Sequence, residues 1–220
     1  MPDKPGSHFV LQDPVHNLIG SPELLVTSNL LDGHIVGSLK NDEVMNKVNI
    51  GLMVEKAIDR LVELGMVDVN RLGTMGWSQG SILSNALIAH DQRFKVASCG
   101  AGGAEWVSYW GQSYVGYSLC EYYLGASPIE NPGLYKNPEK APFYDARKVV
   151  TPVIMFIGSE DINVPPSQVW ITYRGIQKYG SAPVELYVFP GEPHVLQKLS
   201  HQRRKMIEEQ KWFDKYFFDK

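Results

Sequence analysis

Helices and strands alternate along the sequence from about residue 50 to the C-terminus. The clearest strand is TPVIMFIGS, residues 151–159, which is uncharged, rich in β-branched residues and preceded rather than interrupted by a proline. Such a continuous apolar strand is typical of a sheet that is covered on both faces. Strands joined by crossover helices predict a mostly parallel sheet, so we expect an α/β fold with helices on both faces.

Hydrophobic periodicity predicts the other elements. A helix is expected over 50–65, because Gly65 suits a helix end and five apolar residues share one face: Ile50, Val54, Ile58, Leu61 and Val62. Further strands are expected at 71–76, 94–102 and 183–191. Further helices are expected at 81–90, 166–180 and 197–217.

Two segments lack such periodicity. Residues 103–150, rich in Tyr, Trp, Gly and Pro, are interpreted as a long irregular region. Residues 1–50 are the least readable part, with HFVLQ, ELLVTS and HIVG as candidate short strands that have no convincing helix beside them. We therefore set residues 1–36 apart as an N-terminal segment, and expect the first strands of the sheet to be shortened or missing.

Composition limits the class of protein. A chain of 220 residues that is 44% hydrophobic predicts one domain with a substantial core. A net charge of −3 argues against a nucleic-acid or anionic-membrane partner. The sequence has no apolar run of about 20 residues, and MPDKPGSHFVLQDP lacks the apolar centre of a signal peptide, so we expect a cytoplasmic protein. The two cysteines, Cys99 and Cys120, predict neither a disulfide framework nor a metal site, and Cys99 is interpreted as an inert core thiol.

The stretch GTMGWSQGSIL, residues 73–83, contains a Gly-x-Ser-x-Gly motif between an expected strand and an expected helix. In such an elbow the serine stands on a sharp strand-to-helix turn, where flanking glycines, here Gly76 and Gly80, avoid collisions with the adjacent backbone. Ser78 would then be exposed at the carboxyl edge of the sheet, and the Gln79 backbone N–H would face a developing oxyanion. The alternative is a tight strand–helix turn without chemistry.

The same motif predicts an acid and then a histidine, each in a loop after a later strand. Asp161 follows the strand 151–159 in a G-x-x-D-x-x-V-P arrangement, with Glu160 as the competing carboxylate. Capping of a turn or of a helix N-terminus is the alternative role for either. Of the six histidines, His194 alone follows a strand after the acid, in GEPHVLQK.

Together these three residues predict acyl transfer. His194 would take the proton of Ser78 as general base, and Asp161 would hold the imidazole in the correct tautomer. The acyl-enzyme would then be hydrolysed by water that the same histidine activates. This chemistry requires no metal and no organic cofactor.

Four segments carry a family resemblance: LVELGMVDVNRLGTMGWSQG, HDQRFKVASCGAGGAEWVSYWG, GSEDINVPPSQ and PGEPHVLQ. Together they resemble the catalytic domain of the prolyl oligopeptidase family of serine peptidases, the acylaminoacyl-peptidase and dipeptidyl-peptidase type. The resemblance implies an α/β-hydrolase domain over residues 37–220. It also implies a short peptide as substrate, with Ser78, Asp161 and His194 as the triad.

An aromatic group past the strand at 94–102 lies, in the family's architecture, near the pocket for the residue preceding the cleaved bond. It comprises Trp106, Tyr109, Trp110 and Tyr114. The resemblance thus makes Trp106, Tyr109 and Trp110 candidate substrate contacts. The alternative is that these aromatics pack a long loop onto the domain.

The sequence departs from the family pattern ahead of the serine. Family members usually carry a β-propeller before the hydrolase domain, and many have a His-Gly-Gly-type segment near the oxyanion site; this sequence has neither. Unless residues 1–50 rebuild the strand beside the elbow, a hydrophobic sheet edge is left, which predicts association between copies of the chain. A carboxylesterase with the same triad and a truncated, non-catalytic fragment or interaction protein are therefore the alternatives to a peptidase.

Overall fold

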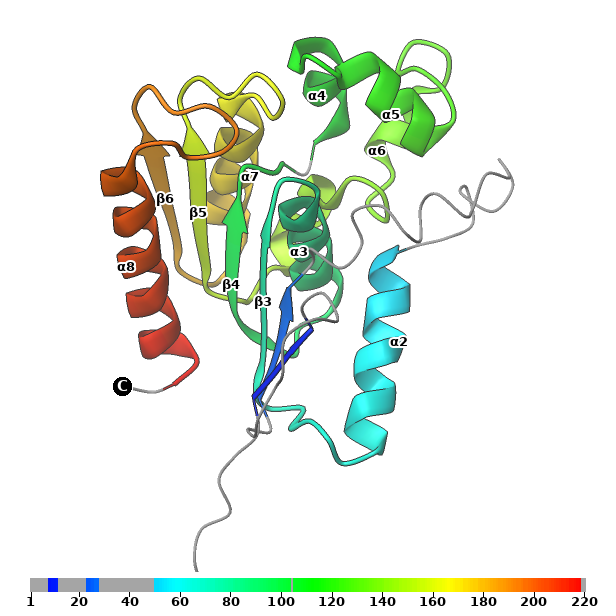
Figure 1. Cartoon of the computed structure of the whole chain (residues 1–220). Coiled ribbons are helices and arrows are strands. Elements are labelled where there is room, and N and C mark those ends of the chain that lie inside the picture. The colour runs from blue at the N-terminus through cyan, green and yellow to red at the C-terminus, as the bar shows by residue number, and fades with distance from the viewer. Residues whose placement is uncertain (1–7, 12–22, 28–49, 104, 219–220) are drawn as a thin grey trace, which may run out of the picture.

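The computed structural model describes residues 8–11, 23–27, 50–103 and 105–218 (Figure 1). The strands are β1 (His8–Leu11), β2 (Glu23–Thr27), β3 (Leu72–Trp77), β4 (Phe94–Gly100), β5 (Val153–Gly158) and β6 (Val184–Phe189). The helices are α2 (Ile50–Glu63), α3 (Gln79–His90), α4 (Trp106–Gln112), α5 (Gly116–Leu124), α6 (Pro132–Lys136), the 3-10 helix η3 (Pro142–Lys148), α7 (Pro166–Tyr179) and α8 (Leu199–Tyr216).

The strands form one parallel sheet in the order β1-β2-β3-β4-β5-β6. Two of the candidate N-terminal strands, HFVLQ and ELLVTS, contain β1 and β2, whereas HIVG lies outside the described residues. Strand β2 pairs with β3, with Leu24 opposite Leu72 and Thr27 opposite Met75. The strand that leads into Ser78 therefore has a neighbour on each side.

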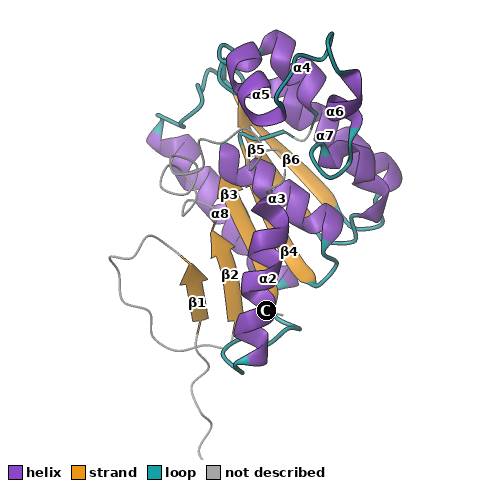
Figure 2. Cartoon of the chain, turned by 90° about the vertical axis from the view of Figure 1, so that its right-hand side faces the viewer, coloured by secondary structure: helices purple, strands orange, loops and turns teal. Residues whose placement is uncertain are grey.

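Helices cover both faces of the sheet, as the sequence predicts. Helices α2, α3 and α7 lie on one face and α8 lies on the other (Figures 1 and 2). Each crossover leads to the next strand in the same direction, and right-handed connections then place the crossover helices on one face. The final helix has no strand to follow, so it can cover the opposite face.

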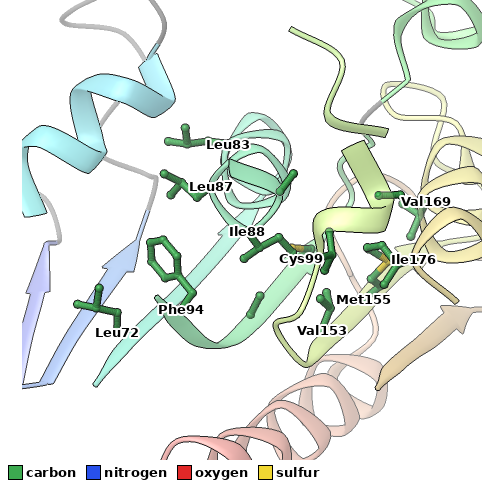
Figure 3. Packing of buried hydrophobic residues seen from close by; sticks show 14 of the residues in the cluster. Leu72, Leu83, Leu87, Ile88, Phe94, Cys99, Val153, Met155, Val169 and Ile176 are labelled. Carbon is green, nitrogen blue, oxygen red and sulfur yellow. The ribbon is translucent and has the colours of Figure 1, made fainter. Parts of the chain in front are cut away.

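Successive side chains along a strand point to opposite faces of the sheet, so the core around the sheet is divided into two clusters. On β4, Ala97 and Cys99 face the cluster with α3 and α7, shown in Figure 3, while Val96 faces the cluster with Trp212 and Phe213 of α8. The Cys99 side chain is fully buried, and burial raises the pKa of its thiol to about 12. A thiol with this pKa stays protonated at neutral pH, as expected for an inert core residue.

The expected end of the first long helix is confirmed in detail. Gly65 has a φ of +67°, its N–H donates to the Val62 carbonyl, and the Met66 N–H donates to the Leu61 carbonyl. These two bonds form a Schellman motif, which satisfies carbonyls left free at the helix end. The helix turns its Ile58 side chain, which is fully buried, into the core.

The interpretation of residues 103–150 as irregular is wrong. This segment contains α4, α5 and α6, which lie beyond the carboxyl ends of the strands in both views of the molecule (Figures 1 and 2), and η3, which packs against α3 and α7. The buried apolar residues of α4, α5 and α6 form a cluster of their own with Ile82 and Val164, whereas Ala146 of η3 belongs to the cluster with α3 and α7. The sequence does not predict these helices because they are short and contain glycine and proline. Packing, rather than intrinsic propensity, stabilises them.

No helix in the described part of the chain combines the length and the apolar character that crossing a bilayer would need.

Candidate active site

Ser78 stands at the turn between β3, which ends at Trp77, and α3, which begins at Gln79. Its φ of 59° and ψ of −125° are rare for a residue with a side chain. The turn is held by hydrogen bonds from the Ser78 N–H to the Gly100 carbonyl, 2.9 Å, and from the Ser81 N–H to the Ser78 carbonyl, 2.9 Å. The strained backbone is thus fixed by the neighbouring strand and by the first turn of the helix, as a nucleophile elbow requires.

The glycine-rich end of β4 makes room for this turn. A Cβ on Gly102 would lie 2.5 Å from the Ser78 carbonyl oxygen, and one on Gly100 would collide with the Trp77 indole. Between them, Ala101 adopts a positive φ of 47°. The glycines of the sequence CGAGG therefore let the backbone at the end of β4 pack directly against the turn that contains Ser78.

His194 lies between Ser78 and Asp161. Its Nε2 is 2.8 Å from the Ser78 Oγ, and its Nδ1 is 2.7 Å from the Asp161 Oδ2. An ionised carboxylate can only accept, so Nδ1 carries the proton and Nε2 is left to accept from the serine hydroxyl. The three side chains form one continuous hydrogen-bond chain, in which this tautomer lets Ser78 donate to His194 and His194 donate to Asp161.

Asp161 is held by the turn in which it lies. Its side chain is buried, and Oδ1 accepts from the Asn163 N–H at 2.9 Å and the Val164 N–H at 2.8 Å. The other oxygen is thereby turned toward His194. Glu160, the competing carboxylate, is exposed, so the structure brings Asp161 rather than Glu160 to the histidine.

The loops that follow β5 and β6 touch directly. The Glu160 N–H donates to the Glu192 carbonyl at 2.9 Å, and a Cβ on Gly158 would collide with that same carbonyl. The Trp77 Nε1–H donates to the His194 carbonyl at 2.8 Å. The loop with the histidine is therefore bonded to both the acid loop and the strand that carries the serine.

Gln79, whose backbone N–H is the expected oxyanion donor, is the first residue of α3. The first N–H groups of a helix have no acceptor within it and carry a partial positive charge. This position, directly after Ser78, suits the stabilisation of a negative oxygen.

The three candidate substrate contacts are mainly packing residues. Trp106 and Tyr109 are only 6% and 4% exposed and belong to the cluster under α4 and α5, against which Trp110 packs. The Trp106 indole N–H donates to the Lys140 carbonyl, and that of Trp110 to the Glu121 carboxylate. The packing alternative accounts for these contacts, and binding of a substrate by them stays a prediction.

The same helices support the acid loop. The Tyr114 N–H donates to the Ile162 carbonyl at 2.8 Å, and the Ser113 hydroxyl donates to the Asn163 carbonyl at 2.5 Å. Burial raises the pKa of Tyr109 to about 12, so this phenol remains neutral beside Asp161. The α4–α5 turn thus contributes to the site by holding the backbone next to Asp161.

Two residues that sequence reasoning missed also contact the loop of His194. Trp77 occupies the unspecified position before the serine in the Gly-x-Ser-x-Gly motif, and nothing in the sequence indicates its indole hydrogen bond. Glu192 is completely buried, although glutamate in a loop is usually exposed. Its place two residues before His194, directly after a glycine, is the only local signal for it. In the described ranges, no three His, Cys, Asp or Glu side chains are grouped to hold a metal ion.

The chain is similar to a known family over most of its length. The model of the prolyl oligopeptidase family matches residues 54–220. The uncharacterized peptidase YuxL of Bacillus subtilis is 27% identical over 167 residues, which is 74% of this chain and 25% of that protein. The acylamino-acid-releasing enzyme of Arabidopsis thaliana is 26% identical over 168 residues, 73% of this chain and 22% of that protein. The chain therefore spans about a quarter of the length of these relatives.

Solved structures share the fold. The acylaminoacyl peptidase of Pyrococcus horikoshii superposes with a TM-score of 0.67 at 21% identity, covering 73% of this chain and 26% of that one. A puromycin-hydrolyzing peptidase of Mycobacterium tuberculosis gives a TM-score of 0.65 at 23% identity, covering 73% of this chain and 24% of that one. The sheet and its helices thus have the α/β-hydrolase arrangement expected from the sequence.

Proposed function

Because the chain belongs to the prolyl oligopeptidase family, we propose that it is a serine peptidase that hydrolyses short peptides through Ser78, His194 and Asp161. The observation that carries the proposal is the unbroken hydrogen-bond chain from the Asp161 carboxylate through the imidazole to the Ser78 hydroxyl. A serine hydroxyl is a weak nucleophile until a base accepts its proton, and this arrangement supplies that base.

Acylation begins when the Ser78 Oγ attacks the carbonyl carbon of the scissile bond. The hydroxyl proton moves to His194 Nε2, and the buried Asp161 carboxylate stabilises the imidazolium that forms. The tetrahedral intermediate collapses as the imidazolium gives that proton to the leaving amine. The amine departs, and the acyl group remains as an ester on Ser78.

Deacylation repeats these steps with water. His194 Nε2 takes a proton from a water molecule as the oxygen attacks the ester carbonyl. The second tetrahedral intermediate expels the Ser78 Oγ, which recovers its proton from the imidazolium. The products are a carboxylic acid and the free enzyme.

The negative oxygen of both intermediates needs a donor that is already in place. The Gln79 N–H, at the start of α3 and next in sequence to Ser78, is the donor that the described residues offer. Removal of one such donor typically slows an enzyme about 100- to 1000-fold. The geometry of the elbow therefore supports catalysis in addition to exposing the serine.

A short peptide, including one with a blocked N-terminal residue, is the proposed substrate. The printed names of the relatives support this class: one is an acylamino-acid-releasing enzyme, and two solved neighbours are an acylaminoacyl peptidase and a puromycin-hydrolyzing peptidase. Two of these names refer to an acylated amino acid, and the third refers to puromycin. N-acyl aminoacyl p-nitroanilides and puromycin are accordingly the first substrates to test.

Labelling with a fluorophosphonate probe tests the proposal most directly. We expect the wild-type chain to label at one site, Ser78→Ala to lose labelling entirely, and His194→Ala to label far more slowly. Mass spectrometry of the labelled peptide identifies the site. A folded wild-type chain that fails to label would favour the non-catalytic alternative.

A second comparison separates the peptidase from a carboxylesterase, since the same triad cleaves esters more readily than amides. Turnover of the p-nitroanilides is measured beside that of simple p-nitrophenyl esters. We expect both to be cleaved, and both activities to disappear in Ser78→Ala. Ester turnover without any amide turnover would replace the peptidase assignment with the esterase.

A further inference from the structure

Glu192 is a buried carboxylate that the proposed chemistry does not use. It is 0% exposed, and its oxygens accept three hydrogen bonds. Oε2 accepts from the Gln197 N–H at 2.5 Å, and Oε1 accepts from the Lys198 N–H at 3.1 Å. The third partner is the His201 ring, whose Nδ1 is 2.6 Å from Oε1. A buried carboxylate costs free energy unless it is hydrogen-bonded, and these three donors satisfy the Glu192 carboxylate.

These bonds close a loop that contains the proposed base. His194 lies between Glu192 and Gln197, so the carboxylate joins the two ends of the segment that carries the imidazole. Lys198 is the N-cap residue of α8, and His201 lies in the first turn of that helix. The carboxylate therefore ties the segment to the helix that packs against the far face of the sheet.

The backbone of the same segment is fixed from the opposite side. The Glu192 carbonyl accepts from the Glu160 N–H in the acid loop, and the His194 carbonyl accepts from the Trp77 indole beside the serine. With both sides held, the Cα of His194 has little freedom relative to Ser78 and Asp161. Both ring nitrogens of His194 are occupied by these two partners, so no ring nitrogen remains to orient the imidazole against its own loop.

The charge of Glu192 strengthens this arrangement. Burial raises the pKa of its carboxyl, but the hydrogen bonds from Gln197, from His201 and from Lys198 outweigh that effect and lower the pKa below its ordinary value. The group therefore remains an ionised acceptor at neutral pH. Charge-assisted hydrogen bonds of this kind are roughly twice as strong as neutral ones.

We infer that Glu192 is a positioning residue for the His194 imidazole. Its carboxylate binds the backbone N–H groups at the end of the segment 192–198, and this closed segment holds His194 in place. The inference rests on the proposed function, because it assigns Glu192 to the accuracy of the Ser78–His194 contact. Glu192 acts through backbone and helix contacts, whereas the reacting groups are those of Ser78 and His194. Its loss should therefore slow the chemical step and leave substrate binding almost unchanged.

The first test is Glu192→Gln in the full chain. A glutamine side chain has nearly the same shape, but its NH₂ group would face N–H donors where the carboxylate accepted. We expect fluorophosphonate labelling and kcat to fall about 100-fold, the typical result of a misplacement of about 1 Å, with KM nearly unchanged. Glu160→Gln is the matched control, since it removes an exposed negative charge from the neighbouring loop and should label at the wild-type rate.

A second variant covers the case in which Glu192→Gln does not fold, which thermal unfolding will reveal. His201→Ala removes one of the three hydrogen bonds from the side where the ring is partly exposed. Loss of one charge-assisted bond should slow labelling about 10-fold, again without a change in KM. Wild-type labelling rates in both variants would overturn the inference.

Proton NMR gives a readout that does not depend on turnover. The proton between His194 Nδ1 and Asp161 should give a separate downfield resonance in the wild type, and this resonance should broaden or disappear in Glu192→Gln. An unchanged resonance in a folded variant would contradict positioning by Glu192. If instead the wild-type chain fails to label while the resonance responds to the substitution, the proposed function fails and the positioning role stands.

Discussion

The loops after β5 and β6 lie side by side, yet they hold their functional side chains in different ways. Asp161 is oriented locally, because its carboxylate bonds the backbone N–H groups of Asn163 and Val164 within the same turn. His194 has no equivalent local bond, because both of its ring nitrogens contact the other two residues of the site. Its place depends on how the loop backbone is held, by Glu192 and by Trp77.

The acid and the histidine are therefore not equally predictable from local sequence. Asp161 is oriented by bonds within its own turn, so a short motif is enough to place it. The histidine is placed by contacts that reach across the fold, and substitutions outside the hydrogen-bond chain should therefore affect it more. The substitutions below affect one of the two loops, the contact between them, or the bond from Trp77 that holds the histidine loop.

The largest effect should come from Asp161→Asn. The amide oxygen can still accept from the Asn163 and Val164 N–H groups, so the acid loop should keep its shape and the melting temperature should change little. The NH₂ group, however, cannot accept the His194 Nδ1 proton, and the imidazole is left with the wrong tautomer. The rate should fall about 10,000-fold, measured as kcat/KM on a p-nitroanilide.

Glu160→Gln is the control for that prediction, because it changes the adjacent carboxylate, which is exposed. An equal loss of activity in Glu160→Gln would contradict the assignment of Asp161 as the acid. A large drop in the melting temperature of Asp161→Asn would show that the acid loop is not held locally.

Gly158→Ala should disturb the contact between the two loops. The new Cβ would collide with the Glu192 carbonyl, and its neighbours there are backbone atoms that cannot rotate away. Overpacking of this kind typically costs about 1–3 kcal/mol. We expect a lower denaturation midpoint in urea together with slower fluorophosphonate labelling, since the loops must separate to admit the methyl group.

Gly111→Ala is a matched control, because a Cβ at that helical position would meet nothing within 4 Å apart from its chain neighbours and its own helix backbone. It should not lower the denaturation midpoint, because alanine favours a helix over glycine, and it should leave the labelling rate nearly unchanged. If Gly158→Ala behaved in the same way, the two loops would not be in the close contact that the structure gives them.

Trp77→Phe should have a smaller effect that falls on the histidine alone. Phenylalanine retains an aromatic ring against Gly100 but cannot donate to the His194 carbonyl. The loss of a single neutral hydrogen bond is worth about 1 kcal/mol, so we expect a rate reduced several-fold. The measurement is kcat on the p-nitroanilide, and an unchanged kcat with an equally stable protein would show that the indole bond does not position the histidine.

The sequence predicts those parts of the molecule that depend on local pattern. The continuous apolar run of TPVIMFIGS predicts β5, and the glycines around Ser78 predict the turn between β3 and α3. The order of serine, acid and histidine also selects the three side chains that the structure brings together. Their catalytic roles stay a proposal until they are tested by labelling.

The features that sequence reasoning missed depend on contacts between distant residues. The bond between Trp77 and His194 spans 117 positions, and nothing near either residue indicates it. The helices α4, α5 and α6 are short and interrupted by Gly and Pro, and their stability comes from the buried cluster that they form together. Even Glu192, whose partners are near in sequence, is recognised only when its burial is known.

The smallest predicted effect is a pH-dependent one, confined to the histidine loop. Because the pKa of Glu192 is lowered in the folded protein, its ionised form contributes stability that is fully present above its ordinary value of 4.5. That contribution is lost as the pH falls below 4.5 and through the lower pKa of the folded state. The Glu192→Gln variant lacks it at every pH. The difference in unfolding free energy between wild type and variant, followed by urea denaturation from about pH 7 to about pH 3, should therefore shrink in the acid range. A constant difference would mean that the loop is closed by the shape of the side chain and not by its charge.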